Sequence, residues 1–144
     1  MSKGMIMKLV EIQHRYPNST TFKFGDNDAL CQELLKLVRS GKKVATCEAL
    51  RVYETSGEII PEVGRRDIAL NWNGTPALVI ETISVSLKKF CDVDEEFALA
   101  EGENDSLEEW RNDHRDYFER NGGFELEMML VCEYFKLVED LAAA

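Results

Sequence analysis

The segment 67–87 reads DIALNWNGTPALVIETISVSL and decides the fold class. Two apolar runs flank Asn73-Gly74, the dipeptide that most strongly favours a tight hairpin turn, because both residues tolerate positive φ. The second run, residues 75–87, is rich in Val, Ile and Thr and predicts a long strand. We therefore expect an antiparallel β-hairpin in this part of the chain.

Upstream of the hairpin, the sequence has the pattern of an amphipathic helix. Four apolar residues recur at the spacing of one helical face: Leu30, Leu34, Leu37 and Val38. Asp26 or Asn27 can cap the first amides, Asp26 most simply, and Gly41 is placed to end the helix. Residues 20–24 predict a short strand before it. Residues 1–16 form an apolar-polar lead-in to which we assign no element.

Downstream of the hairpin, the sequence predicts two helices and a closing strand. The first helix covers residues 92–100, and Ser106 with Glu109 has the capping-box spacing that opens the second. The packed stripe of that second helix is Leu107, Trp110, His114, Tyr117 and Phe118. Residues 128–137 predict the strand. We expect one domain over residues 1–144, of α+β class with a mainly antiparallel sheet.

The composition is that of a soluble globular protein, with 44% hydrophobic and 31% charged residues. The apolar runs are too short to span a bilayer, and the first residues do not resemble a signal peptide, so we expect a cytoplasmic protein. The four cysteines form no Cys-x-x-Cys pair and the two histidines lie in unrelated segments, so we expect reduced thiols and no metal site. The oligomeric state stays open.

The formal net charge is −10. A domain that grips a long phosphate backbone normally carries a basic surplus, because neutralising phosphates supplies most of the nonspecific affinity. This chain has no such surplus. Any contact with nucleic acid must therefore come from a local basic patch, or the ligand must be small.

Three segments, in this order along the chain, carry a further likeness. They are FGD at 24–26 with the following helix and GKKVAT at 41–46; PEVG at 61–64 with GTP at 74–76 and LVIETISV at 78–85; and FALAEGE at 97–103 with Ser106, Leu107 and Trp110. Together they resemble the ASCH domain family, in particular its longer bacterial branch. The resemblance implies a PUA-like β-barrel with helices packed outside, a core of about residues 20–138, and a groove near Gly41-Lys42-Lys43.

The resemblance also implies a catalytic set. A small ASCH enzyme that deacetylates acetylcytidine uses a Lys, a Thr and a Glu, which Lys43, Thr46 and Glu103 match, with Glu101 in reserve. The lysine acts as general base only if its pKa falls towards neutrality, through burial or a neighbouring cation such as Lys42. It then activates the hydroxyl for acyl transfer, while the carboxylate orients the lysine or protonates the leaving amine. Without the resemblance, these residues fit ordinary helix-end and strand positions.

Basic side chains near the expected groove are the candidates for phosphate contact: Lys42, Arg51, Arg65 and Arg66. Each also fits a solvated surface position. Trp72 and Tyr53 can stack on a base or belong to the core. The expected partner is RNA or a modified nucleoside, and no cofactor is expected. Three functions stay open: an amidohydrolase acting on an acylated nucleoside such as acetylcytidine, a non-catalytic RNA-binding regulatory module, and a ribonuclease.

Overall fold

The computed structural model describes residues 3–141, and the side chains of residues 8–141. The helices are α1 (Lys3–Arg15), α2 (Asp28–Arg39), α3 (Leu50–Ser56), α4 (Glu95–Ala100) and α5 (Leu107–Arg120), with a 3₁₀ turn, η1, at Phe90–Asp92. The strands are β1 (Thr21–Phe22), β2 (Ala45–Ala49), β3 (Arg66–Leu70), β4 (Pro76–Lys89) and β5 (Met129–Asp140). These elements confirm the α+β class.

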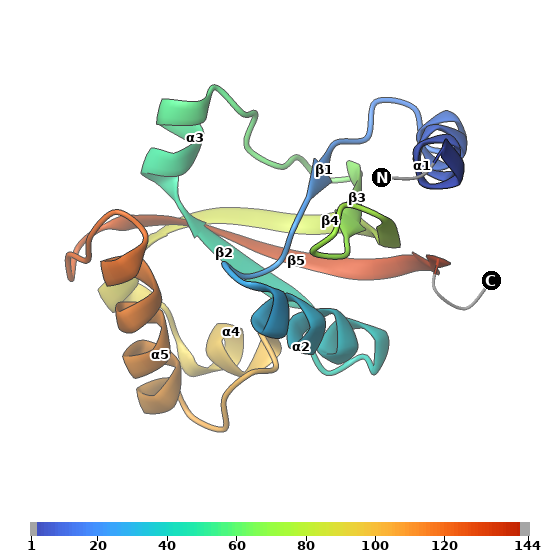
Figure 1. Ribbon diagram of the computed structural model, residues 1–144. Helices are drawn as coiled ribbons and strands as arrows, with labels where there is room; N and C mark the ends of the chain where they lie inside the picture. The colour runs from blue at the N-terminus through green and yellow to red at the C-terminus, as the bar shows by residue number, and fades with distance from the viewer. Residues whose placement is uncertain (1–2, 142–144) are drawn as a thin grey trace.

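The five strands form one sheet in the order β1-β3-β4-β5-β2. β1 pairs with β3 in parallel, and the other three pairings are antiparallel, with the long strands β4 and β5 in the middle (Figure 1). The β3–β4 hairpin was predicted, but its connection is wider than a two-residue turn. The N–H of Asn71 donates to the carbonyl oxygen of Thr75 (2.7 Å), and Gly74 has a φ of 91°.

The sheet does not close into the barrel that the family resemblance implied. Within residues 3–141, the edge strand β1 pairs only with β3, and the edge strand β2 only with β5. β1 has just two residues, after which the chain turns away into α2, so no hydrogen-bonded ladder joins it to β2. The expectation of a closed barrel was therefore wrong, and the two edges leave room between them.

The helix α2 begins at a cap other than the one expected. The side chain of Asn27 accepts a hydrogen bond from the Leu30 N–H (2.9 Å), so Asn27 is the N-cap. Asp26 instead accepts from Nε of Arg120 (2.8 Å) and from the side-chain amide of Asn121 (2.9 Å). Asp26 therefore ties the start of α2 to the end of α5, and its expected capping role was wrong.

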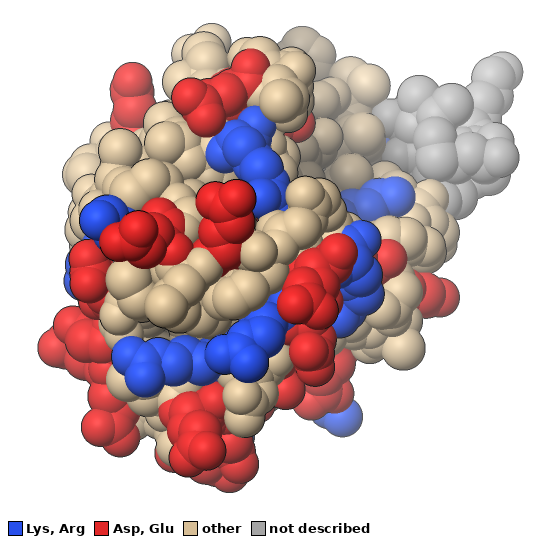
Figure 2. Space-filling model, turned by 90° about the vertical axis from the view of Figure 1, so that its left-hand side faces the viewer, with Lys and Arg blue, Asp and Glu red and all other residues tan. Residues whose placement is uncertain are grey.

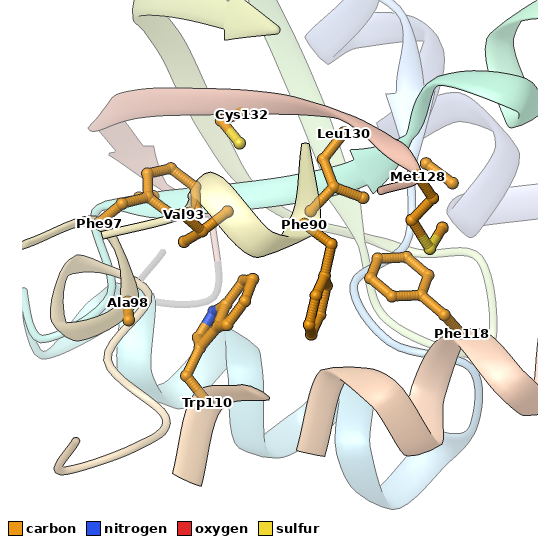
Figure 3. Packing of buried hydrophobic residues seen from close by; sticks show 11 residues of the cluster. Phe90, Val93, Phe97, Ala98, Trp110, Phe118, Met128, Leu130 and Cys132 are labelled. Atoms are coloured by element: carbon orange, nitrogen blue, oxygen red, sulfur yellow. The ribbon is translucent and has the colours of Figure 1, made fainter. Parts of the chain in front are cut away.

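Helices lie on both faces of the sheet, with α2, α4 and α5 on one face and α1 and α3 on the other (Figure 1). The largest core cluster lies between α5 and β5. In it, Trp110 stacks on Phe90 with ring centroids 5.3 Å apart, and Phe118 meets Phe90 edge-on at 6.3 Å (Figure 3). This packing fixes α5, and with it the side chains that α5 presents to the site, against the sheet.

The helix α1 falls in residues 1–16, to which the sequence analysis assigned no element. Ile12 and the following Tyr16 are buried against Ile68 and Val79. At the end of the helix, Arg15 pairs with Glu139 of β5 (2.6 Å), and the Tyr16 hydroxyl donates to the same carboxylate (2.7 Å). Within residues 3–141, no helix combines the length and the hydropathy needed to cross a membrane.

Candidate functional site

A cavity of about 840 Å³ lies between the two edge strands of the sheet. Its wall includes β1 and the residues after it, β2, part of α3, the 58–65 segment and the inner side of α5. Lys43, Thr46, Glu101 and Glu103 all line it, so the structure brings the predicted catalytic set to one cavity. Nine Asp and Glu residues line the cavity against four Lys and Arg residues, which makes the site predominantly acidic.

The turn at Gly102 brings two glutamates against Lys43. Gly102 has a φ of +77°, and a Cβ there would lie 2.6 Å from the Lys42 carbonyl oxygen and 2.9 Å from the Lys43 Cα. A hydrogen bond from the Val44 N–H to the Ala100 carbonyl oxygen (2.8 Å) joins the same two segments. Glycine is required at this close approach of two backbones, and the turn therefore sets the position of the carboxylates on either side of it.

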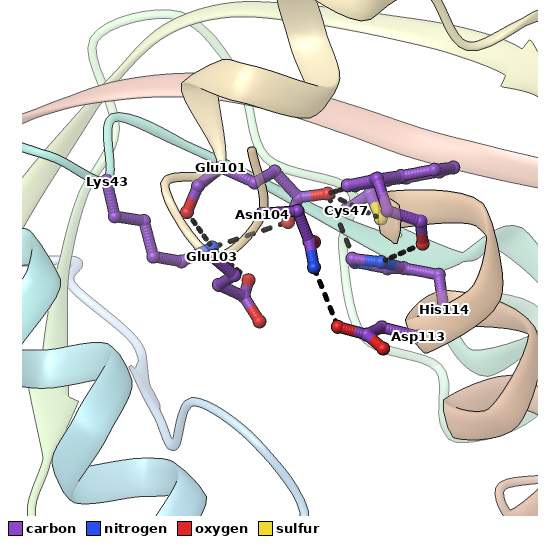
Figure 4. Close-up of polar contacts among 8 residues, drawn as sticks. Lys43, Cys47, Glu101, Glu103, Asn104, Asp113 and His114 are labelled. Carbon is purple, nitrogen blue, oxygen red and sulfur yellow. Dashed lines mark hydrogen bonds and ion pairs between the residues drawn. The ribbon is translucent and has the colours of Figure 1, made fainter. Parts of the chain in front are cut away.

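Lys43 is a buried amine held by two carboxylates. Only 1% of the residue is exposed, and its Nζ lies 3.0 Å from Glu103 Oε2, 3.3 Å from Glu101 Oε1 and 3.3 Å from the Glu101 carbonyl oxygen (Figure 4). Burial alone would lower the pKa of Lys43, but the two carboxylates outweigh it and raise that pKa above its usual value. The direction is opposite to the one a general base requires, so Lys43 is a cation at neutral pH.

Glu101 is the centre of this network. It is 2% exposed, and its Oε2 accepts a hydrogen bond from Trp110 Nε1 (2.6 Å) and lies 3.2 Å from His114 Nε2 and 3.5 Å from Cys47 Sγ. Burial alone would raise the pKa of Glu101, but the charges of His114 and Lys43 and the hydrogen bonds lower it to about 2. Glu101 is therefore ionised at neutral pH.

His114 completes the network from α5, where it stacks on Trp110 with ring centroids 4.2 Å apart. Its Nδ1 lies 2.9 Å from the Trp110 carbonyl oxygen, which can only accept, so Nδ1 carries a proton. Its Nε2 faces the Glu101 carboxylate, which also needs a donor. Burial would lower the pKa of His114, but Glu101 raises it, and this favours the doubly protonated ring. The predicted packed histidine is thus also an ion-pair partner.

Cys47, Glu101 and His114 place one potential metal-ligand atom each within 4.8 Å of one another. Sulfur, nitrogen and carboxylate oxygen are donors that zinc accepts. Binding there would require the Cys47 thiol and His114 Nε2 to lose protons, yet burial and Glu101 raise the pKa of the thiol, and Glu101 raises that of the imidazole. The same Glu101 oxygen already accepts from Trp110. These contacts favour a protonated hydrogen-bond network over a metal centre.

Thr46 lies on the other face of β2 from Cys47, directly opposite Glu133 of β5 in the antiparallel register. Among the described residues, no hydrogen bond engages the Thr46 hydroxyl. Glu133 is 7% exposed, accepts from the Thr82 hydroxyl (2.6 Å) and lines the cavity; burial raises its pKa. Glu133 was not predicted as a site residue, because a carboxyl in an apolar strand becomes recognisable only through its cross-strand neighbour.

Of the residues predicted to bind phosphate, only Arg65 lines the cavity. Its Nε donates to Asp67 Oδ2 (2.9 Å) and its Nη1 to a backbone carbonyl oxygen in the 58–65 segment (3.0 Å). Arg66 points to the outside, where its half-exposed side chain pairs with Glu81 (2.9 Å). The two arginines therefore do not act together at one site.

The other predicted binding residues are dispersed as well. Lys42 is exposed after the end of α2 and does not line the cavity, while the guanidinium of Arg51 donates to the carbonyl oxygen of Gly123 (2.5 Å) and so holds the turn after α5. Of the two aromatic candidates, Tyr53 lines the cavity, whereas Trp72 lies at the surface. The structure thus brings the residues of the predicted catalytic set to the wall of one cavity, whereas the residues predicted to bind phosphate lie apart.

Comparison with known proteins gives this arrangement a family. The sequence pattern of the ASCH domain matches residues 20–139. The crystal structure of an ASCH domain from Lactobacillus crispatus JV V101 superposes with a TM-score of 0.81, at 31% identity over 96% of both chains. A protein from Enterococcus faecalis V583 also gives 0.81, at 29% identity over 97% of this chain and 91% of its own. No curated protein matches the chain.

A more distant ASCH protein from Zymomonas mobilis shares the fold alone, with a TM-score of 0.51 and 12% identity over 86% of this chain and 73% of that one. The fold and the cavity define the class: an α+β domain of the PUA-like kind, with an open sheet and a pocket between its edge strands. The chain belongs to the ASCH domain family.

Proposed function

We propose that this protein binds a modified nucleoside in the cavity and hydrolyses an acyl amide on its base, with acetylcytidine as the candidate substrate. The observation that carries the proposal is that Thr46, whose hydroxyl has no hydrogen bond among the described residues, lines the same cavity as a buried amine, Lys43, and its two carboxylates. This is the set of groups that the family resemblance associates with deacetylation.

The cavity favours a nucleoside over a nucleic-acid strand. Its volume, about 840 Å³, is in the range of pockets that enclose small organic ligands. The acidic lining disfavours phosphate, and the predicted phosphate-binding residues are dispersed. On the face shown in Figure 2, Lys and Arg side chains form a short band with Asp and Glu on both sides of it, rather than an extended basic surface. An uncharged ligand avoids the repulsion that a phosphate would meet.

In this reaction Thr46 Oγ attacks the acyl carbon, a C–O bond forms and the C–N bond to the base breaks. The amine leaves with a proton, and water then hydrolyses the acyl-threonine to give free acetate and cytidine. In this proposal Lys43 acts as a cation that stabilises the negative charge developing on the acyl oxygen. Glu103 and Glu101 hold that amine in position and keep it charged.

The test is to incubate the purified full chain with acetylcytidine and measure released cytidine by chromatography. We expect release by the wild type and a strong loss in Thr46→Val and Lys43→Ala. Arg66→Ala is the matched control, because Arg66 is outside the cavity. A wild type no faster than Lys43→Ala would reject the proposal. Salt-sensitive binding of single-stranded RNA, weakened by Arg65→Ala and without cytidine release, would support the RNA-binding alternative instead.

A further inference from the structure

The proposed reaction lacks a proton acceptor for the Thr46 hydroxyl. Lys43 does not serve, because Glu101 and Glu103 keep its amine protonated. These two carboxylates are themselves committed to holding the cation. A group that takes a proton from Thr46 must therefore come from another part of the cavity wall.

The sheet register places one carboxyl beside Thr46. Thr46 of β2 and Glu133 of β5 are direct partners in the antiparallel pairing, and such partners extend to the same face with Cβ atoms about 5 Å apart. Both line the cavity. Glu48, two residues along β2, is on the same face, but it lies opposite Val131 in the register rather than beside Thr46, and its Oε1 accepts a hydrogen bond from the N–H of Ala49 (2.9 Å).

The Glu133 carboxyl is held by one oxygen and open at the other. Oε2 accepts from the hydroxyl of Thr82, a residue that is 1% exposed, at 2.6 Å. Within the described residues, Oε1 has no hydrogen bond, and it is not sealed off from the cavity. The charged and titratable groups around Glu133 are Arg65 and Asp67 at β3 and Tyr53 from α3. Arg65 already pairs with Asp67, which leaves Glu133 without a dedicated cation.

We propose that Glu133 is a further catalytic residue and accepts the proton of the Thr46 hydroxyl. The inference rests on the proposed amidohydrolase function. As the Thr46 Oγ–acyl carbon bond forms, the Oγ–H bond breaks and the proton moves to Glu133 Oε1. Glu133 returns that proton to the nitrogen as the C–N bond breaks. In the second step it takes a proton from water, whose oxygen attacks the acyl carbon, and gives it to Thr46 Oγ.

Burial supports this role, because it raises the pKa of Glu133 towards the range in which a carboxyl both accepts and releases protons near neutrality. The hydrogen bond from Thr82 acts in the opposite direction and lowers that pKa. Thr82 is therefore a positioning residue. Its removal should move the acid limb of the pH–rate profile to higher pH, an effect that a merely structural residue does not produce.

The experiment measures kcat and KM for acetylcytidine in wild type, Glu133→Gln, Thr82→Val and Glu48→Gln. For Glu133→Gln we expect a fall in kcat of about 10²- to 10⁴-fold, the usual contribution of a general base, with little change in KM. In the pH–rate profile of Glu133→Gln, the fall in kcat on the acid side should disappear. Thr82→Val should lose less activity and move the acid limb of the profile to higher pH. Glu48→Gln is the control on the same face of β2, and its kcat should stay close to that of the wild type.

Each outcome decides between the two proposals. A wild type without cytidine release overturns both of them. An active wild type with Glu133→Gln within about threefold of its kcat, or with the large loss in Glu48→Gln instead, overturns only the role of Glu133. If Glu133→Gln does not fold, as judged by circular dichroism, Glu133→Asp gives the decision. It keeps a carboxylate, so it should retain the acid limb with reduced kcat, and an unchanged kcat would contradict the proposal.

Discussion

Replacement of Glu101 by Gln tests whether the buried network depends on one carboxylate. The pKa of Glu101 is lowered from 4.5 to about 2, and at about 1.4 kcal/mol per unit this corresponds to about 3 kcal/mol of stability at neutral pH. Only 2% of Glu101 is exposed, so solvent screens little of its attraction to Lys43 and His114. A glutamine presents an amide where donors converge, and Lys43 and His114 lose a shared counter-charge. We expect the free energy of unfolding to fall by about 3 kcal/mol.

The assay is urea unfolding of wild type and Glu101→Gln at several pH values. A carboxyl with a lowered folded-state pKa stabilises above its unfolded value of 4.5, and that contribution is lost as pH falls towards about 2. The difference should therefore shrink by about half between pH 7 and pH 3. Glu103→Gln is the matched control, because the side chain of Glu103 is 23% exposed and, among the residues whose side chains are described, its carboxylate pairs with Lys43 alone. Equal losses in the two variants, or a difference independent of pH, would refute the reasoning.

Three other predictions follow from single contacts. Gly102→Ala should lower the free energy of unfolding in urea by more than about 2 kcal/mol, because the added Cβ would lie 2.6 Å from a backbone carbonyl oxygen. The control is Gly57→Ala, which has the same φ of +77° but open space around it, and it should lower that free energy by only about 1 kcal/mol. Asn27→Ala should lose about 1 kcal/mol in the same assay, as it removes an N-cap. Because Glu101 raises the pKa of His114, NMR should detect the protons on both ring nitrogens of His114 above pH 6.5, and loss of one of them at pH 6.5 would contradict this. The stability that the His114–Glu101 ion pair contributes should decline as pH rises through the raised pKa of His114.

Local signals in the sequence were enough to predict most elements. The 3.6-residue spacing in 30–38, the run in 75–87 and the Ser106 cap each depend on neighbours a few residues away, and the structure has a helix, a strand and a capped helix at these places. The choice between Asp26 and Asn27 failed, because it was decided by Arg120, 94 residues along the chain. A local pattern does not contain that partner.

Closure of the sheet depends on information of another kind. A barrel needs the two edge strands to be long enough to pair, and β1 has two residues. Propensity does not fix where so short a strand ends, since the turn into α2 and the packing of Phe24 against that helix decide it. The helix α1 was missed for a related reason: it is stabilised by contact with the outer face of the sheet, which does not exist until the sheet has formed.

The pKa of Lys43 likewise depends on residues that are distant in the sequence. Burial or a neighbouring cation such as Lys42 was the condition for a lowered pKa of Lys43, and Lys43 is indeed buried. The turn at Gly102 nevertheless places two carboxylates within 3.3 Å of its amine, and their attraction exceeds the cost of burial. Once the amine is held as a cation, its usefulness is electrostatic, and proton transfer has to fall to a group whose charge is not already neutralised by a partner. In this cavity Glu133 faces Thr46, and no Lys or Arg within the described part of the chain forms an ion pair with its carboxylate, so Glu133 meets that condition.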